Sequence, residues 1–310
     1  MAENEKLYLG IDIGGTHLRM ALADDSIKSS SFELLKTPEV FGNTSDPSGK
    51  LAENIRGYCE RHLGGRMPAA VSIGFPSTLN RERTIVLQTP NIACIPDDFP
   101  VVKELTDILG IPVFINRDVN NLLLYDMNNL GIDLKSTVTG IYFGTGIGNS
   151  VVIDGKFMYG RDGVAAELGH IPVLGNRRKC TCGNTGCLET VISGIALQRI
   201  RAENFPETEI GEIFAEHGTS PVIEEFLEGM AQTIALEINI FDPDYMVLGG
   251  GLFQMKGIPM KRIEEYVHFY ARKPYPEKDL RILYSKPDQE NGTLGAVLYA
   301  KRRMTDREFL

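Results

Sequence analysis

Two stretches of this chain share one pattern, which consists of an apolar run, a turn rich in glycine and a second run in which apolar residues recur. The first covers residues 7–23 with its turn at Gly14 and Gly15, and the second covers residues 140–156 with its turn at Gly144–Gly146. Each predicts a β-hairpin, because the strand pattern resumes directly after the glycines. Walker loops and dinucleotide fingerprints need a helix at that point, so the sequence disfavours both. We therefore expect two related halves.

The rest of the chain alternates short apolar runs with runs of helical periodicity. The expected elements are strands at 69–76 and 113–116, helices around 100–110, 188–201 and 222–240, a strand at 245–248 and a final helix at 292–303. Strands that alternate with helices indicate the α/β class, with strands and helices in packed layers.

The length of 310 residues and an apolar content of 43% are enough for two hydrophobic cores. The duplicated hairpins suggest where the chain divides. We expect a smaller N-terminal domain from residues 1–117 and 296–310, which holds the first hairpin. Residues 118–295 are then the larger C-terminal domain, which holds the second hairpin and a cluster of cysteines.

The charge balance excludes some classes of partner. The chain has 32 basic and 41 acidic residues, which give a net charge of -9. This sign disfavours a protein whose main partner is a nucleic acid or an anionic membrane. The acidic N-terminus predicts neither a signal peptide nor a membrane span, so we expect a cytoplasmic protein.

One histidine and three cysteines lie close together in the sequence, at His170, Cys180, Cys182 and Cys187. Three thiolates and one imidazole are the donors that complete a tetrahedral Zn²⁺ shell, and the glycines between the cysteines allow a short loop to wrap around the ion. Four protein ligands leave no open position, so such a zinc would be structural. The alternative is a pair of cysteines with unrelated neighbours. The remaining cysteines, Cys59 and Cys94, are expected to be apolar core residues.

The two glycine turns can present backbone N–H groups to an anion. With the hydroxyls of Thr16 and Thr145 beside them, they suit successive phosphates of a nucleotide. Asp12 precedes the first turn, where a carboxylate can hold Mg²⁺ directly or through water. The alternatives are that the glycines only provide positive φ and that Asp12 caps the turn.

An ordered set of motifs resembles the ROK family of sugar kinases. The set consists of Asp12-Ile-Gly-Gly-Thr16, Asn116-Arg-Asp-Val-Asn120, Glu167-Leu-Gly-His170, the cysteine cluster with Glu189, and Leu248-Gly-Gly-Gly251. The resemblance spans most of the chain. It implies the actin-like, ribonuclease-H-type two-domain fold, with the active site in the interdomain cleft. It also implies a homodimer.

The same resemblance assigns nucleotide-binding residues to this chain. ATP phosphates would lie on the turn formed by Gly14, Gly15, Thr16 and His17 and on the turn formed by Gly144, Thr145 and Gly146, with Gly249, Gly250 and Gly251 near the adenosine.

Asp118 is the candidate catalytic base, since a sugar hydroxyl that attacks a γ-phosphoryl group needs a proton acceptor. The alternative is that Asp118 only caps the helix expected to follow it. Glu167 and Glu189 flank the metal cluster and, in the family, bind sugar hydroxyls; the alternative is a pair of solvated helix-end charges. Asn91 and Asn116 carry amides that can read a sugar's hydroxyl pattern.

Two positions depart from the usual ROK pattern, because Arg117 stands where Asn is common and His17 where Lys or Asn is common. Together with Gly74-Phe-Pro, Arg83-Thr-Ile and Thr89-Pro-Asn, they resemble the D-allose kinases of the family. We expect phosphorylation of a hexose by ATP with Mg²⁺, at the 6-hydroxyl, with D-allose as the first candidate. Glucose, fructose and N-acetylhexosamines are the alternatives within the family.

A different class of protein is also open, namely a catalytically weak sugar-sensing regulator without a DNA-binding domain. The first glycine hairpin begins by residue 12, which leaves no room for such a domain ahead of it, and Asp12 and Asp118 favour the enzyme.

Overall fold

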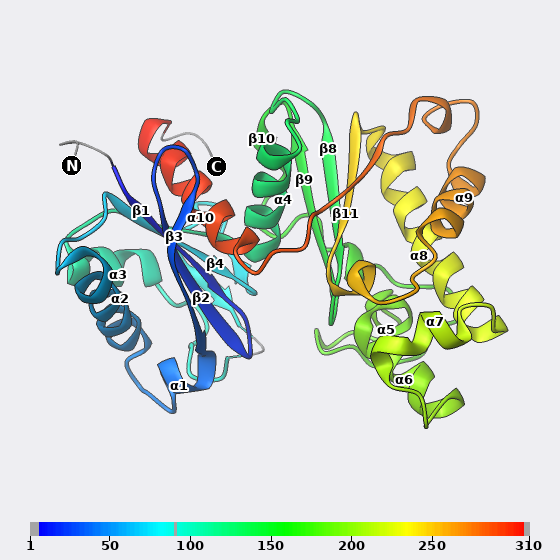
Figure 1. Ribbon diagram of the computed structural model, residues 1–310, viewed down its shortest axis with the longest axis horizontal. Helices are drawn as coiled ribbons and strands as arrows, with labels where there is room; N and C mark the ends of the chain where they lie inside the picture. The colour runs from blue at the N-terminus through cyan, green and yellow to red at the C-terminus, as the bar shows by residue number, and fades with distance from the viewer. Residues whose placement is uncertain (1–5, 90–91, 307–310) are drawn as a thin grey trace. The chain divides into compact units, whose positions relative to one another are not determined.

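The computed structural model describes residues 6–89 and 92–306, and the chain divides into two compact units. Unit 1 is built from the described residues up to 132, residues 159–165 and residues from 288 onward, and unit 2 from residues 133–158 and 166–287. Each unit contains one five-stranded sheet and its own helices (Figure 1).

The sheet of unit 1 has the strand order β3-β2-β1-β4-β7. The strands are β1 Tyr8–Ile13, β2 His17–Ala23, β3 Ser29–Lys36, β4 Ala70–Phe75 and β7 Val113–Arg117. The first three pair antiparallel, whereas β1, β4 and β7 run parallel. The first glycine turn therefore joins two antiparallel strands, as the sequence predicts.

Helices cover both faces of this sheet. Leu9 and Ile11 of β1 pack with residues of α2 and α3, while Tyr8 packs with Leu294 and Val297 of α10 on the other face. Gly10 is required on the α10 side, because a Cβ there would lie 2.0 Å from the carbonyl oxygen of Thr293. The elements besides the sheet are α1 Thr37–Phe41, α2 Pro47–Leu63, α3 Val101–Leu109, α4 Asp118–Asn129, α10 Asn291–Thr305 and the small hairpin of β5 Thr78–Leu79 and β6 Val86–Gln88.

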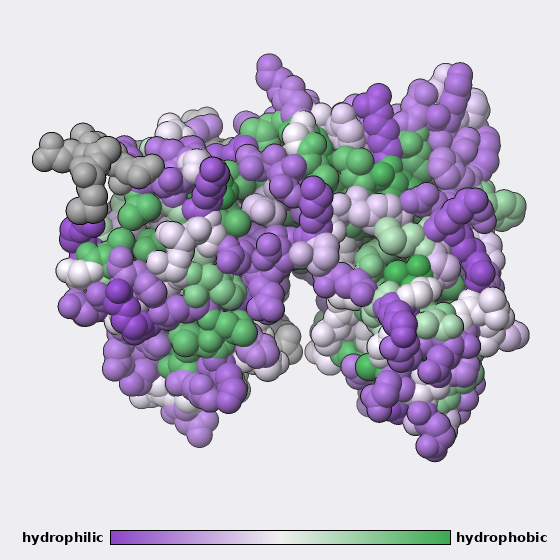
Figure 2. Space-filling view, in the orientation of Figure 1, coloured by the Kyte–Doolittle hydropathy of each residue, from purple (hydrophilic) through white to green (hydrophobic). Residues whose placement is uncertain are grey.

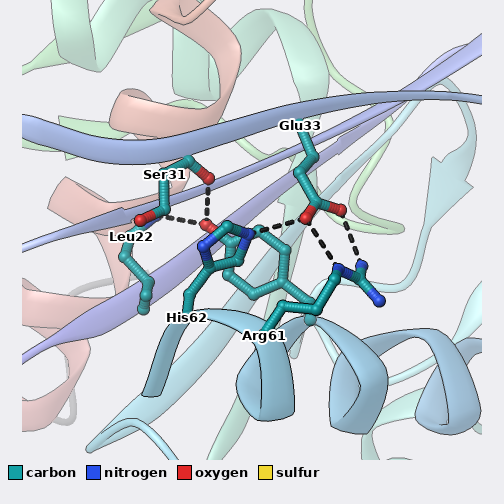
Figure 3. A network of polar contacts seen from close by, with 6 residues as sticks. Leu22, Ser31, Glu33, Arg61 and His62 are labelled. Atoms are coloured by element: carbon teal, nitrogen blue, oxygen red, sulfur yellow. Dashed lines mark hydrogen bonds and ion pairs between the residues drawn. The ribbon is translucent and has the colours of Figure 1, made fainter. Parts of the chain in front are cut away.

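A polar network fastens the edge strand β3 to α2 (Figure 3). Arg61 donates two hydrogen bonds to the carboxylate of Glu33, at 2.9 and 2.7 Å, and His62 contacts the same carboxylate at 2.6 Å. The buried hydroxyl of Tyr58 donates to the carbonyl of Ser31 and accepts from the N–H of Leu22. The hydrogen bond from Arg61 holds the pKa of Glu33 below its ordinary value, against the effect of burial.

The sheet of unit 2 repeats the topology of unit 1, with the order β10-β9-β8-β11-β12. The strands are β8 Val138–Phe143, β9 Ile147–Ile153, β10 Lys156–Phe157, β11 Tyr245–Gly249 and β12 Ile282–Tyr284. Again an antiparallel hairpin opens the sheet, and two parallel strands follow. The two sheets thus confirm the two related halves that the glycine hairpins predict.

The helices of unit 2 follow the second hairpin. They are α5 Glu189–Ile192, α6 Gly194–Asn204, α7 Ile213–His217, α8 Pro221–Phe241 and α9 Met260–Tyr270, with short 3₁₀ turns η1 Leu168–His170, η2 Ile210–Glu212, η3 Gly251–Gln254 and η4 Glu277–Asp279. The single helix expected at 188–201 is divided at Ser193. The backbone of Ser193 is extended, and the Ser193 side chain accepts the N–H of Ala196 to cap α6.

The division between the units lies elsewhere than residues 117 and 296. Helix α4 belongs to unit 1, where it packs on α10, and residues 288–295 belong to unit 1 as well. The short segment Tyr159–Ala165 also belongs to unit 1, whereas the residues on either side of it belong to unit 2. These contacts join parts of the chain that are far apart in sequence, which local patterns do not report.

Hydrophilic side chains dominate the visible face of each unit (Figure 2), in keeping with the acidic composition. In the described part of the chain, every helix is too short or too polar to span a membrane. Cys59 is fully buried, as expected for a core residue, and Cys94 is half-buried.

Candidate functional site

Three parallel strands of unit 1 end at the same edge of the sheet. Asp12 of β1, Gly74 of β4 and Asn116 of β7 are neighbours in register. A Cβ added to Gly74 would lie 3.4 Å from the Cα of Asp118 and 3.5 Å from Oδ1 of Asp12. The structure therefore brings the predicted base and the predicted Mg²⁺ carboxylate to one glycine, at the carboxyl ends of the strands where ligands of α/β sheets bind.

Asp12 lies in a crowded environment. A Cβ on Gly292, at the start of α10, would lie 2.7 Å from the Asp12 carboxyl carbon, so the helix approaches this side chain through a glycine. Arg19 donates to Oδ2 at 3.3 Å. Burial raises the pKa of Asp12, and the charge and hydrogen bond of Arg19 oppose that effect only in part. A carboxylate in this position suits a further cation such as Mg²⁺.

Asp118 is the first residue of α4, and its Oδ1 accepts the N–H of Val119 at 2.7 Å. The capping residue of the helix is Arg117, whose side chain makes no cap bond. Asp118 therefore uses one carboxylate oxygen on the first turn of the helix, although it is not the N-cap residue.

A group of buried asparagines surrounds this edge. Asn116 is fully buried, and its Oδ1 accepts from the N–H of Arg117 at 3.0 Å and from Nδ2 of Asn120 at 2.9 Å. Asn121 is also fully buried, and among the described residues its side-chain amide makes no hydrogen bond. Its Nδ2 lies 3.0 Å from where a Cβ on Gly74 would be. Asn120 and Asn121 were missed from the sequence, although two adjacent amides on the buried face of an apolar helix are a usable signal.

Two hydrogen bonds at Gly14 close the first glycine turn. Gly14 donates to the carbonyl of His17 at 2.8 Å, and the hydroxyl of Thr37 donates to the carbonyl of Gly14 at 2.6 Å. Gly14 does not adopt positive φ, so a left-handed backbone is not the reason why this position is a glycine. Gly15 and Thr16 are exposed, and His17 begins β2.

The second glycine turn is held by the first residues of α6. The N–H groups of Gly194 and Ile195 donate to the carbonyls of Gly144 and Thr145, at 2.8 and 3.1 Å. Thr145 itself is exposed. These bonds hold the turn in place while its hydroxyl stays accessible.

Glu189 also contacts this turn. Its Oε2 accepts the N–H of Ile147 at 3.0 Å, and a Cβ on Gly146 would lie 2.1 Å from the same oxygen. Gly146 is therefore a close-approach glycine. The contact between Glu189 and the turn was not foreseen from the sequence, because the two lie far apart along the chain.

The glycine triplet after β11 has different surroundings at each position. Gly250 has a φ of 93°, and a Cβ there would lie 2.4 Å from the carbonyl of Phe143, so packing against β8 requires glycine. Gly249 packs on Tyr142, and Gly251 faces open space. Asn91, the remaining candidate, lies outside the described residues.

The predicted metal ligands converge. One donor atom from each of His170, Cys180, Cys182 and Cys187 lies within 4.8 Å of the others. Sγ of Cys182 and Sγ of Cys187 are 3.7 Å apart, and Sγ of Cys180 is 3.6 Å from Nδ1 of His170. A tetrahedral Zn²⁺ with ordinary bond lengths requires about 3.8 Å between two sulfurs and about 3.6 Å between sulfur and nitrogen. The donor set therefore fits zinc in identity, and these two pairs fit it in spacing as well.

The loop that carries the ligands is shaped by two glycines. Gly183 and Gly186 have φ of 94° and 91°, and the N–H of Gly183 donates to the carbonyl of Cys180 at 3.1 Å. Nε2 of His170 lies 3.8 Å from Oε2 of Glu167, whose side chain is 38% exposed. Thus Nδ1 of the imidazole faces the sulfurs and Nε2 faces a carboxylate, the usual arrangement behind a metal-bound histidine.

This chain is similar to known proteins over most of its length. Residues 8–303 match the ROK family. The chain is 27% identical to a glucokinase of Thermotoga maritima over 318 residues, which covers 96% of this chain and 98% of the relative. It is 29% identical to an N-acetyl-D-glucosamine kinase of Photobacterium profundum over 314 residues, which covers 94% and 98%.

Two solved structures are similar throughout. A ROK glucokinase from Streptomyces griseus, in complex with glucose and AMPPNP, has a TM-score of 0.77 at 26% identity and covers 96% of this chain and 99% of its own. A ROK transcriptional regulator homologous to the E. coli MLC protein has a TM-score of 0.80 at 26% identity and covers 96% and 78%. The expected actin-like α/β fold class is confirmed. The match to the family model over nearly the whole described chain shows that this protein belongs to the ROK family.

Proposed function

We propose that this chain is a sugar kinase that transfers the γ-phosphoryl group of ATP to the 6-hydroxyl of a hexose. Family membership and the kinase names of the relatives support an ATP-dependent hexose kinase. The observation that carries the proposal is the approach of Asp12 and Asp118 to the same glycine, Gly74. Phosphoryl transfer needs charge neutralisation and a proton acceptor, and two carboxylates at the carboxyl ends of parallel strands supply both.

Each side chain has a separate part in the proposed reaction. Asp118 accepts the proton of the attacking sugar hydroxyl. Asp12 holds Mg²⁺, directly or through water, beside the phosphates. The exposed backbone and hydroxyls at Thr16 and Thr145 bind phosphate oxygens. Apart from this proton transfer, the protein supplies positioning and charge, which is what this reaction class requires.

The sugar contacts depend on the metal loop. We assign a structural Zn²⁺ to His170 and the three cysteines, where it holds the loop rigid and adds folding energy. That loop carries Glu167, and Glu189 follows it. The residues proposed to contact sugar hydroxyls are Glu167, Glu189, Asn91 and Asn116. The buried Asn116 also stabilises the end of β7, because its Oδ1 accepts a hydrogen bond from Asn120.

The proposed sugar is D-allose. The support is the pair of departures at Arg117 and His17, which together with Gly74-Phe-Pro, Arg83-Thr-Ile and Thr89-Pro-Asn resembles the D-allose kinases. The named relatives act on glucose or N-acetylglucosamine, so these two sugars are the direct competitors.

The test is ATP-dependent ADP formation in a coupled assay with D-allose, glucose, mannose, fructose, N-acetylmannosamine and N-acetylglucosamine. We expect turnover with at least one sugar, and the highest kcat/KM with D-allose. A higher kcat/KM for another hexose replaces the substrate but keeps the kinase. Activity with none of them refutes the kinase.

The similarity to a ROK transcriptional regulator supports a second candidate, a sugar sensor with weak or no catalysis. Calorimetry separates the two. Micromolar sugar binding without ADP formation would favour the sensor, whereas sugar binding with turnover favours the kinase.

A further inference from the structure

A short segment leaves unit 2 after β10, packs within unit 1 and returns at Ala166. It spans Tyr159–Ala165 and closes on itself, because the N–H of Ala165 donates to the carbonyl of Tyr159 at 3.0 Å. Gly163 is fitted against the β5–β6 hairpin, where a Cβ would lie 2.4 Å from the carbonyl of Leu79. The segment is therefore a compact loop with a defined packing site in unit 1.

Arg83 lines one side of that packing site. The residue is 3% exposed, and its guanidinium carbon lies 3.7 Å from the centre of the Tyr159 ring. Its Nη1 donates to the carbonyl of Gly163 at 3.0 Å and to that of Leu79 at 3.3 Å. The backbone of Arg83 is left-handed, with a φ of 54°. Such a conformation is unfavourable for a side chain of this size and persists only where the surroundings hold it.

Arg117 contacts the last residue of the segment. Its Nη1 donates to the carbonyl of Ala165 at 3.2 Å. In the sequence, Arg117 directly precedes Asp118, and Ala165 stands two residues before Glu167. Between them, Ala166 has a left-handed φ of 63°, a second strained position just beyond the contact. A single guanidinium thus connects the end of β7 to the start of the loop that carries Glu167.

We propose that Arg117, with Arg83, clamps the Tyr159–Ala165 segment and that Arg117 is thereby a positioning residue for the sugar-binding carboxylate of Glu167. The inference rests on the proposed function. It assigns the guanidinium to a backbone carbonyl rather than to the sugar or the phosphates. Two peptide units separate the clamped carbonyl from Glu167, so freedom at Ala165 is transmitted to the carboxylate.

The primary test is Arg117→Met, because Arg117 is only half-buried and its replacement does not open the core that Arg83 fills. We expect the sugar KM to rise on the order of 10-fold or more, with the ATP KM unchanged, since small displacements of a positioning group are costly. Arg117→Lys keeps a cationic donor and should recover part of the loss. An unchanged sugar KM overturns the proposal, and so does a rise confined to the ATP KM.

A double variant tests whether Arg117 acts through Glu167. If it does, Arg117→Met with Glu167→Gln should bind sugar no more weakly than Glu167→Gln alone. Additive losses would mean that Arg117 contacts the sugar itself. Arg56→Met is the matched control, because Arg56 also donates to a backbone carbonyl within unit 1, that of Ile108 at 2.5 Å. It should leave both KM values unchanged.

A measurement without sugar separates this inference from the kinase proposal. Hydrogen–deuterium exchange of the peptide that covers Tyr159–Ala165 should become faster in Arg117→Met and stay unchanged in Arg56→Met. Equal exchange in wild type and Arg117→Met refutes the clamp even if the wild type is an active kinase. If the wild type phosphorylates no sugar but exchange responds as expected, the clamp stands and only its link to sugar binding fails.

Discussion

A buried carboxyl group in unit 2 gives a quantitative prediction about stability. Glu237 of α8 is 4% exposed, and Nδ2 of Asn149 on β9 lies 3.4 Å from its Oε2. Burial raises the pKa of Glu237 from 4.5 to about 7, and the hydrogen bond from Asn149 opposes this only in part. Asn149 also donates to the carbonyl of Gly140, so it links Glu237 to the hairpin that carries the second glycine turn.

The sign of the effect follows from the direction of this change. Between pH 4.5 and about 7 the folded protein keeps a proton on Glu237 that the unfolded chain has lost, so stability falls as the pH rises and levels off above about 7. At about 1.4 kcal/mol per pKa unit, the difference between the two values corresponds to about 3 kcal/mol. Glu237→Gln resembles the protonated acid at every pH and should remove this loss.

The assay is urea denaturation followed by far-UV circular dichroism from pH 5 to 8, since the chain has no tryptophan. The free energy of unfolding of Glu237→Gln, taken relative to wild type, should increase by about 2–3 kcal/mol over this range. Glu225→Gln, at an exposed position of the same helix, should show no such trend. A constant difference between Glu237→Gln and wild type would refute the reasoning.

Three further predictions concern other parts of the chain. Gly292→Ala places a Cβ 2.7 Å from the Asp12 carboxyl carbon, so we expect a higher KM for Mg·ATP with sugar binding in the absence of nucleotide unchanged, as measured by steady-state kinetics and calorimetry. Wild type should contain about one zinc per chain by elemental analysis, and Cys182→Ala should lose both the metal and cooperative unfolding; a metal-free, fully stable wild type would contradict this. Arg61→Met should cost at most about 1 kcal/mol of unfolding free energy at pH 7, since the pair with Glu33 is partly exposed. Because the pKa of Glu33 is lowered, that cost should shrink as acid protonates the carboxyl group, and a cost that stays constant as the pH falls would exclude the ion pair as its source.

Local patterns predicted much of the fold. The strand-turn-strand motif predicted both hairpins, and these begin two sheets of the same topology. The sequence assigned residues 118–129 to the C-terminal domain, whereas α4 belongs to unit 1, because its place depends on packing against α10, which lies far away in the chain. It also missed the break at Ser193, because an apolar helical pattern continues across a residue whose side chain caps a new helix.

The sequence predicted which residues belong to the candidate site, but not which contacts they make. Spacing and chemistry identified the four metal ligands, whose donor atoms do converge. They did not reveal that Glu189 accepts the N–H of Ile147, or that Gly74 and Gly292 are the close-approach glycines beside Asp12. Such contacts arise when distant segments pack together, and no periodicity in the sequence records them.

The most direct test of the central claim is the variant Asp118→Asn, assayed with the best sugar of the panel. The amide keeps the size of the side chain and can still accept the N–H of Val119, but it is a poor proton acceptor. We predict a fall in kcat of about 10²–10⁴-fold, with the sugar dissociation constant from calorimetry changed by less than about threefold. Unchanged kcat would return Asp118 to a purely structural role at the start of α4 and would contradict the proposed mechanism.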